Sequence, residues 1–321
     1  MSNLSRYLGI IDLGSNSVRL KISRIEMDGS YSTVQYEKRY VRLSSNMGQE
    51  KTLKVEPIER TIAALTEFRE ICDQYEHLKI IAVATAAVRQ AQNQKDFLKR
   101  VKKETGFLIH VISGEQEAYL DYVGVSRTLA LKDGLILDTG GASMELILVC
   151  DGQAEEVLSI PLGSVLLSQR YHLEDKISAG DLFQAIVKVD EVLSKEVWLN
   201  RIRKGQLVAL GGCNRALAKI YRWQQSINSE QAAPIHGLAI EPKDAFTIMD
   251  TLLGSSRSER GKIRGVSKER ADVIVGGLLP LLAIVRQQQL QEIKFSNSGL
   301  REGLLFRYLE HEASLDNLMT S

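Results

Sequence analysis

The chain has 321 residues, of which 44% are hydrophobic and 25% are charged, and its 41 basic residues nearly balance its 40 acidic ones. This length and composition predict a globular protein of about two domains. The near-zero net charge argues against a nucleic-acid-binding protein with a strongly basic face, so we expect no nucleic-acid partner.

Short β-branched runs alternate along the chain with amphipathic helical patterns. The predicted strands cover residues 8–12, 18–25, 79–84, 108–112, 135–138, 145–150, 207–210 and 293–295. The predicted helices cover residues 58–72, 94–104, 115–128, 180–197, 214–224, 243–254 and 268–288. This alternation predicts layers of sheet and helix rather than a helical bundle.

An internal repeat is the most informative feature. Residues 11–20 read IDLGSNSVRL and residues 137–146 read LDTGGASMEL, and the two align without a gap. Asp12 then matches Asp138, and Gly14 matches Gly140. Each copy stands between two apolar runs, which predicts a β-hairpin closed by a glycine turn. Two such hairpins in one register indicate a duplicated domain.

The repeated turns suit phosphate binding. Gly14, Gly140 and Gly141 can adopt a positive φ and let the backbone approach a ligand, and successive N–H groups then form an anion-binding nest. The residues whose side chains or backbone complete the two turns are Ser15, Asn16, Ser17, Ala142 and Ser143. One D-x-G turn alone is more often an ordinary hairpin turn, but two matched turns favour a phosphate chain held between them.

Carboxylates at the two turns are candidate metal ligands. Asp12 and Asp138 each end an apolar strand, and Glu145 lies on the strand that returns from the second turn. Mg²⁺ prefers one or two carboxylates together with water and phosphate oxygens, so Asp138 and Glu145 are plausible ligands. Arg19 stands where the second copy has Glu145, which predicts that the two halves differ in function.

Two predicted helix starts offer further groups. Glu115, Gln116 and Glu117 open the helix after residue 114, and a carboxylate there could activate a water molecule. Acidic residues are also common in a first helical turn for dipole and capping reasons alone. Arg89 lies just after the strand 79–84, where its guanidinium could bind phosphate or simply be exposed.

Cysteine usage and the apolar pattern bear on location. Cys72, Cys150 and Cys213 are widely spaced and form no CxxC pair, which is typical of reduced thiols in the cytoplasm. No signal peptide is expected at the N-terminus. No apolar run reaches the roughly 18 residues of a membrane span. We therefore expect a cytoplasmic protein without membrane contact.

Five motifs together resemble the exopolyphosphatase / guanosine pentaphosphate phosphohydrolase (Ppx/GppA) family, and they occur in the family's order. The residues that match the family pattern are Asp12–Leu20, Thr85, Arg89, Ala91, Asn93, Ile112–Gly114, Glu117, Ala118, Asp138, Gly140, Gly141, Ser143, Glu145, Leu146 and 300–303. The chain departs from that pattern at Gln116, Tyr119 and Ala142. The match is to the short form, without an added C-terminal helical domain, so we expect a weaker grip on long chains.

This resemblance implies an α/β, duplicated actin-like fold of the acetate/sugar kinase–heat-shock–actin type. Two domains, 1–127 and 128–321, would flank an interdomain cleft, with the last helix able to pack on the first domain. The resemblance also implies that Glu117 is the general base and that Arg89 binds phosphate. The resemblance points to Asp138, Glu145 and Glu117 as metal ligands, and Asp12 is a further expected ligand because of its position at the first turn.

The function expected is that of a Mg²⁺-dependent exopolyphosphatase, which releases terminal orthophosphate from inorganic polyphosphate. Guanosine pentaphosphate is the alternative substrate, because its hydrolysis uses the same chemistry. A kinase of the same fold and a non-catalytic polyphosphate or alarmone sensor remain as alternatives of other classes. The apolar helix at 268–288 predicts burial in the second domain, with a homodimer interface as the alternative.

Overall fold

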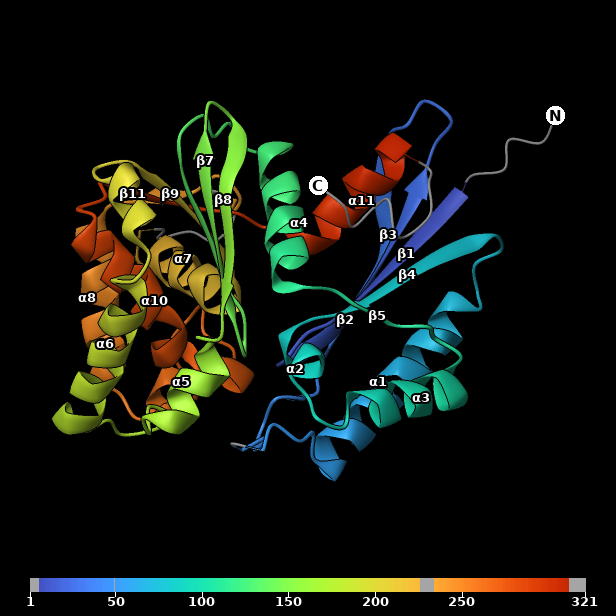
Figure 1. Ribbon diagram of the computed structural model, residues 1–321, viewed down its shortest axis with the longest axis horizontal. Coiled ribbons are helices and arrows are strands. Elements are labelled where there is room, and N and C mark those ends of the chain that lie inside the picture. The colour runs from blue at the N-terminus through green and yellow to red at the C-terminus, as the bar shows by residue number, and fades with distance from the viewer. Residues whose placement is uncertain (1–5, 49, 226–233, 312–321) are drawn as a thin grey trace. The chain divides into compact units, whose positions relative to one another are not determined.

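The computed structural model describes residues 6–48, 50–225 and 234–311. Within them the chain forms two compact units, one from the residues up to 120 together with those from 300 onward, and one from residues 121–299. Each unit is built on one sheet (Figure 1). The domain boundary between residues 127 and 128 stays a prediction. No helix in the described residues has the length and hydropathy required to span a bilayer.

The first unit contains a sheet with the strand order β3-β2-β1-β4-β5. Strands β1 to β3 form an antiparallel meander, and β4 and β5 run parallel to β1. The strands are β1 (Arg6–Leu13), β2 (Ser17–Ile25), β3 (Tyr31–Tyr40), β4 (Leu78–Ala84) and β5 (His110–Val111). The helices are α1 (Val55–Cys72), α2 (Ala86–Arg89), α3 (Gln94–Thr105), the first half of α4 (Gly114–Ser126) and α11 (Leu300–His311).

The second unit contains a sheet with the order β10-β11-β9-β6-β7-β8. Its strands are β6 (Gly134–Thr139), β7 (Met144–Cys150), β8 (Gln153–Ile160), β9 (Gln206–Gly211), β10 (Ala239–Ile240) and β11 (Glu292–Phe295). Its helices after α4 are α5 (Ser164–Arg170), α6 (Ala179–Leu193), α7 (Gly212–Gln225), α8 (Pro242–Leu253), α9 (Arg257–Arg260) and α10 (Ile274–Gln287), with 3₁₀ turns η1 (Val197–Ile202) and η3 (Lys268–Arg270).

The two sheets confirm the predicted duplication. Strands β6, β7 and β8 repeat the meander of β1, β2 and β3, and β9 and β11 repeat the parallel strands β4 and β5. A register shift interrupts both meanders, after Ile22 in the first and after Leu148 in the second. These positions are 126 residues apart (148 − 22), as are Asp12 and Asp138 (138 − 12). The repeat therefore extends well beyond the two glycine turns.

Alternation along β1 decides where Asp12 points. Leu8 and Ile10 pack in a cluster with residues of α11, whereas Ile11 and Leu13 pack in the cluster that contains residues of α1 and α3. Since side chains alternate between the two faces of a strand, Asp12 belongs to the face of Leu8 and Ile10. The strand therefore carries its carboxylate toward the side of the sheet covered by α11.

Several expected elements differ in extent from the structure. The helix predicted at 268–288 begins only at Ile274, after the 3₁₀ turn η3. The strand predicted at 108–112 shrinks to β5, and the helix predicted at 180–197 ends at Leu193. The third strand of each meander, β3 and β8, was absent from the sequence prediction.

The three cysteines carry free thiols. Cys72 and Cys213 are buried, and Cys150 is partly exposed. Burial raises the pKa of the Cys72 thiol to about 11 and also raises the pKa of Cys213. Since the thiolate is the reactive form, both buried thiols are unreactive near neutral pH, in keeping with a structural role.

Candidate active site

Each glycine turn is closed by the same hydrogen bond. Gly14 N–H donates to Ser17 O at 3.1 Å, and Gly140 N–H donates to Ser143 O at 2.9 Å. The expected positive φ was wrong, because Gly14, Gly140 and Gly141 are not among the described residues with a positive φ. The reason for glycine is steric instead: a Cβ would lie 3.1 Å from Ser17 O at position 14 and 3.0 Å from Ser143 O at position 140.

Backbone N–H groups of residues 42 and 44 bind the carbonyl groups of the first loop from one side. Ser15 O accepts from Ser44 N–H at 3.0 Å, and Asn16 O accepts from Arg42 N–H at 3.0 Å. A trans peptide points its N–H opposite to its carbonyl, so the N–H of Asn16 points away from Ser44. Within the described residues, the N–H of Asn16 donates no hydrogen bond to another backbone group. It is a donor suited to an anion.

The second loop has the same arrangement. Gly140 O accepts from Ser164 N–H at 2.9 Å, and Gly141 O accepts from Val165 N–H at 2.9 Å. The N–H groups of Gly141 and Ala142 therefore point away from α5. Ala142 is buried and does not have a positive φ, so its methyl group fits without backbone strain. The departure at this position is thus compatible with an anion-binding turn.

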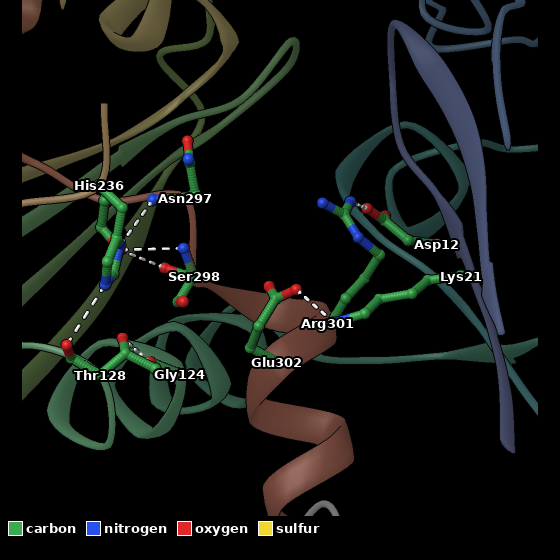
Figure 2. A network of polar contacts seen from close by, with 10 residues as sticks. Asp12, Lys21, Gly124, Thr128, His236, Asn297, Ser298, Arg301 and Glu302 are labelled. Carbon is green, nitrogen blue, oxygen red and sulfur yellow. Dashed lines mark hydrogen bonds and ion pairs between the residues drawn. The ribbon is translucent and has the colours of Figure 1, made fainter. Parts of the chain in front are cut away.

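Asp12 lies at the centre of an ion-pair network in the first unit. Its Oδ2 accepts from Arg301 Nη1 at 2.7 Å (Figure 2) and from Arg19 Nη1 at 3.1 Å. The Arg301 side chain is only 11% exposed. Burial alone would lower the pKa of Arg301, but the carboxylates of Asp12 and Glu302 outweigh it and hold the pKa above its ordinary value. Asp12, expected as a metal ligand, therefore faces two guanidinium groups.

The residues after Arg301 continue this network. Glu302 Oε1 accepts from Lys21 Nζ at 2.9 Å (Figure 2), and the Lys21 side chain is buried. A Cβ on Gly303 would lie 2.0 Å from Leu120 O, so α11 touches the backbone of α4 at this glycine. The sequence matched residues 300–303 to a family motif but did not indicate these contacts, because their partners lie about 280 residues away in the chain.

Arg89 and Glu117 meet in the first unit. Arg89 Nη1 donates to Glu117 Oε2 at 3.1 Å and to Ile112 O at 3.0 Å. The two side chains are 21% and 13% exposed, so the pair is largely withdrawn from solvent but still accessible. No partner within the described residues takes the N–H groups on Nε and Nη2 of Arg89. These donors can bind an anion next to the Glu117 carboxylate.

Gln116, which departs from the family pattern, caps helix α4. Its Oε1 accepts from Ser113 N–H at 2.8 Å, and its own N–H donates to Ser113 Oγ at 3.1 Å. This reciprocal pair is a capping box, in which glutamine and glutamate are equivalent acceptors. The box fixes the start of the helix that carries Glu117.

We therefore expect Gln116→Ala to lower the free energy of unfolding by about 0.5–2 kcal/mol, because the cap is lost. Gln116→Glu is expected to leave both stability and activity close to wild type. Urea unfolding and phosphate release on the two variants check this expectation. A large loss of activity in Gln116→Glu would mean that the glutamine amide has a further role.

Asp138 and Glu145 face each other in the second unit. They are directly opposed on β6 and β7, where the equivalent residues of the first unit are the ion pair Asp12 and Arg19. Glu145 is 1% exposed, and its Oε1 accepts from Ser159 Oγ at 2.8 Å. Two carboxylates brought together in this way are oxygen ligands of the kind that a hard divalent cation prefers. The donor set thus fits Mg²⁺.

Metal ligands need not come from protein alone. The described residues contain no group of three or more His, Cys, Asp or Glu side chains that could hold a metal ion. Mg²⁺ is usually bound by one or two carboxylates, with waters and substrate phosphates completing its octahedron. A pair such as Asp138 and Glu145 is sufficient for that mode of binding. Glu117 and Asp12, the other expected ligands, have arginine partners in the first unit.

The described part of the second unit has two further glycine turns that follow strands, and one of them lies against a site residue. Gly211 has φ +91°, and a Cβ there would lie 2.6 Å from Asp138 Oδ1. Asn214 of α7 donates to Thr139 Oγ1 at 3.2 Å and so ties α7 to the end of β6. These contacts place the start of α7 directly beside the Asp138 carboxylate.

The other turn, residues 296–299, is held by His236. Asn297 N–H donates to His236 Nδ1 at 3.2 Å, and His236 Nε2 lies 3.3 Å from Thr128 O (Figure 2). Since Nδ1 must accept and Nε2 must donate, both bonds are satisfied by the neutral imidazole with its hydrogen on Nε2. The histidine therefore braces the turn that leads into α11.

Comparison with known proteins agrees with the motifs. Residues 22–312 match the model of the Ppx/GppA phosphatase family. The crystal structure of the Aquifex aeolicus family member is 29% identical, covers 97% of this chain and 100% of its own, and has a TM-score of 0.77. An exopolyphosphatase from Cytophaga hutchinsonii ATCC 33406 is also 29% identical, with coverages of 95% and 98% and a TM-score of 0.85.

These likenesses confirm the expected fold. They extend over nearly the whole length of both chains in each comparison, and the two meanders show the duplication directly. The protein thus has the duplicated actin-like α/β fold. With a family model that spans residues 22–312, the chain belongs to the Ppx/GppA phosphatase family and is a hydrolase of phosphoanhydride bonds.

Proposed function

We propose that the protein is an exopolyphosphatase that removes the terminal orthophosphate of inorganic polyphosphate. The observation that carries this proposal is the pair of Arg89 and Glu117, which places free guanidinium donors beside a partly exposed carboxylate. The 29% identical structure from Cytophaga hutchinsonii is itself named an exopolyphosphatase, which supports the choice of substrate. We also propose a cytoplasmic location, which agrees with the free thiols.

In the proposed mechanism the chain's own residues bind phosphate and position water. Arg89 binds oxygens of the terminal phosphate through its Nε and Nη2 donors. The N–H groups of Asn16, Gly141 and Ala142 bind further phosphate oxygens, as oriented backbone dipoles do in anion sites. These contacts stabilise negative charge that spreads over the phosphate oxygens in the transition state.

Glu117 is the proposed general base. It orients a water molecule for in-line attack on the terminal phosphorus and accepts its proton. The new P–O bond forms with water, and the bond to the bridging oxygen breaks. Orthophosphate leaves, and the polyphosphate is one phosphate shorter.

Asp138 and Glu145 are the residues proposed to hold Mg²⁺. When bound, the cation would neutralise charge on the phosphate oxygens. Removal of divalent ions with EDTA is expected to abolish phosphate release, and added Mg²⁺ should restore it.

A variant that removes the charge of Glu145 tests the proposed metal site. Glu145→Gln is expected to raise the Mg²⁺ concentration for half-maximal activity by about 10- to 100-fold. Glu156→Gln is the matched control, because Glu156 lies on the neighbouring strand and is exposed. A Mg²⁺ dependence unchanged in Glu145→Gln would remove Glu145 from the metal site.

The substrate is tested by measuring orthophosphate released from short- and long-chain polyphosphate and from guanosine pentaphosphate. Release from polyphosphate without any acceptor is the expected result and excludes a kinase. Faster release from guanosine pentaphosphate would replace the proposed substrate. Binding of these compounds without release from any of them would show a sensor and overturn the proposal.

A further inference from the structure

Basic side chains follow one face of helix α7. Arg215, Lys219 and Arg222 are four and three residues apart, so they lie on the same side of the helix. At a rise of about 1.5 Å per residue, they span about 10 Å along its axis. The sequence of α7 contains no acidic residue.

A second basic segment packs on this helix. A Cβ on Gly265 would lie 2.7 Å from the backbone nitrogen of Ile220, so the segment around it touches α7 directly. The Arg264 guanidinium lies 5.3 Å from the centre of the Trp223 ring. Residues 262–270 contain four basic residues and one acidic residue, namely Lys262, Arg264, Lys268, Arg270 and Glu269.

These charges lie close enough to affect one another. Desolvation, followed by the positive charges of Arg270, Arg215 and Arg222, lowers the pKa of Lys219. Holding like charges together costs free energy. A cluster of positive charges also attracts a polyanion.

The basic group continues to the site already described. A Cβ on Gly212, the first residue of α7, would lie 2.4 Å from Arg270 Nη2. Its neighbour Gly211 contacts the Asp138 carboxylate. Within the second unit, a path of adjacent residues therefore runs from Asp138 over Arg270 to Lys219.

We infer that this surface, formed by Arg215, Lys219, Arg222, Arg264 and Arg270 and named here the α7 basic face, binds the internal phosphates of a polyphosphate chain. The inference rests on the proposed function and extends it from the terminal phosphate to the chain behind it. Guanidinium groups bind phosphate oxygens in pairs of hydrogen bonds, and several cations over about 10 Å suit a linear polyanion. Because Arg264 lies over one face of the Trp223 ring, a base cannot stack on that face, and we assign the surface to inorganic polyphosphate.

The test compares a triple variant with a matched control in the full chain. The variant carries Lys219→Ala, Arg222→Ala and Arg264→Ala, and the control carries Lys176→Ala, Lys195→Ala and Lys243→Ala, which remove the same charge from exposed sites of the same unit. We expect the KM for long-chain polyphosphate to rise about 10-fold in the variant alone. We expect the KM for tripolyphosphate to stay unchanged, because the inference assigns only the phosphates behind the terminal ones to Lys219, Arg222 and Arg264.

An equal rise for tripolyphosphate, or none for the long chain, would overturn the inference. Direct binding of long-chain polyphosphate and of single-stranded DNA to the same proteins separates the remaining outcomes. Loss of DNA binding with polyphosphate binding intact would assign the surface to nucleic acid and overturn the inference. If wild type bound polyphosphate but released no phosphate, and the triple variant lost this binding, the proposed function would be wrong. The assignment of polyphosphate binding to the α7 basic face would still be supported. Thermal melting confirms that both proteins are folded.

Discussion

Glu117→Gln is expected to reduce kcat for phosphate release by about 10²–10⁴-fold, the contribution typical of a positioned general base. Glutamine has the same shape and can still accept a hydrogen bond from Arg89, but it cannot take a proton from water. The KM should change little, since the phosphate contacts of the loops and of Arg89 remain. Initial rates with short-chain polyphosphate and Mg²⁺ measure the effect.

Glu115→Gln is the matched control for this prediction. Glu115 lies two residues earlier in the same helix but is exposed, and the first cause of its lowered pKa is a hydrogen bond to its own backbone. Its substitution should leave kcat within a factor of about two. If Glu117→Gln retained activity comparable to Glu115→Gln, with native circular dichroism for both, the base would have to be another group and the proposed mechanism would be wrong.

Arg301→Met is expected to destabilise the first unit by about 3–5 kcal/mol, the usual cost of removing one partner from a buried ion pair. The Asp12 carboxylate would keep only the Arg19 contact, and Asp12 is 5% exposed. Methionine preserves most of the apolar volume of arginine, so the loss reports mainly the uncompensated charge. Urea unfolding gives the change in free energy.

Two further variants separate this charge effect from packing. The exposed pair Arg24 and Glu26 offers a control in the same unit, and Arg24→Met should cost less than about 1 kcal/mol. The double variant Asp12→Asn with Arg301→Met should be less destabilised than the sum of the two single variants, because neither charge is then left alone. Additive losses would show that the Asp12–Arg301 contact contributes little.

The sequence was sufficient to predict the parts of the candidate site that short motifs contain. The strand–turn–strand pattern around Asp12 and Asp138 was confirmed, since apolar strands that meet at a glycine turn leave few alternatives. Arg89 and Glu117 were selected individually, and the structure places them in contact. Their roles in binding and catalysis, like those of the other site residues, stay predictions until the variants are measured.

The sequence prediction missed strands β3 and β8, because these strands depend on pairing contacts that a local sequence pattern does not contain. Strand β3 reads YSTVQYEKRY and has no buried residue, so it lacks the alternation of apolar and polar residues by which half-buried strands are recognised. It pairs as the outer strand of a meander, where main-chain hydrogen bonds rather than burial hold it. Strand β8 has the same position in the second sheet, and only its last residue, Ile160, is buried.

The turn glycines were predicted correctly, but the physical reason for glycine at these positions was not. Sequence reasoning chose the property that glycine most often supplies, a positive φ. In this protein Gly14 and Gly140 serve instead because a Cβ would crowd a carbonyl oxygen three residues later. Only coordinates distinguish these two reasons. The prediction of an anion-binding turn does not depend on the choice, since it requires N–H groups that point away from the strands.

The packing of α11 on β1 has a consequence for how the protein is made. Helix α11 supplies Leu304, Leu305 and Tyr308 to the cluster that covers Leu8 and Ile10. A ribosome synthesises β1 before residues 121–299 and α11 only after them. The second unit is continuous in sequence and can fold as soon as it emerges. Domains generally fold from the N-terminus during synthesis. In this protein the first unit is expected to complete its folding after the second, because one apolar face of its sheet stays uncovered until α11 is synthesised.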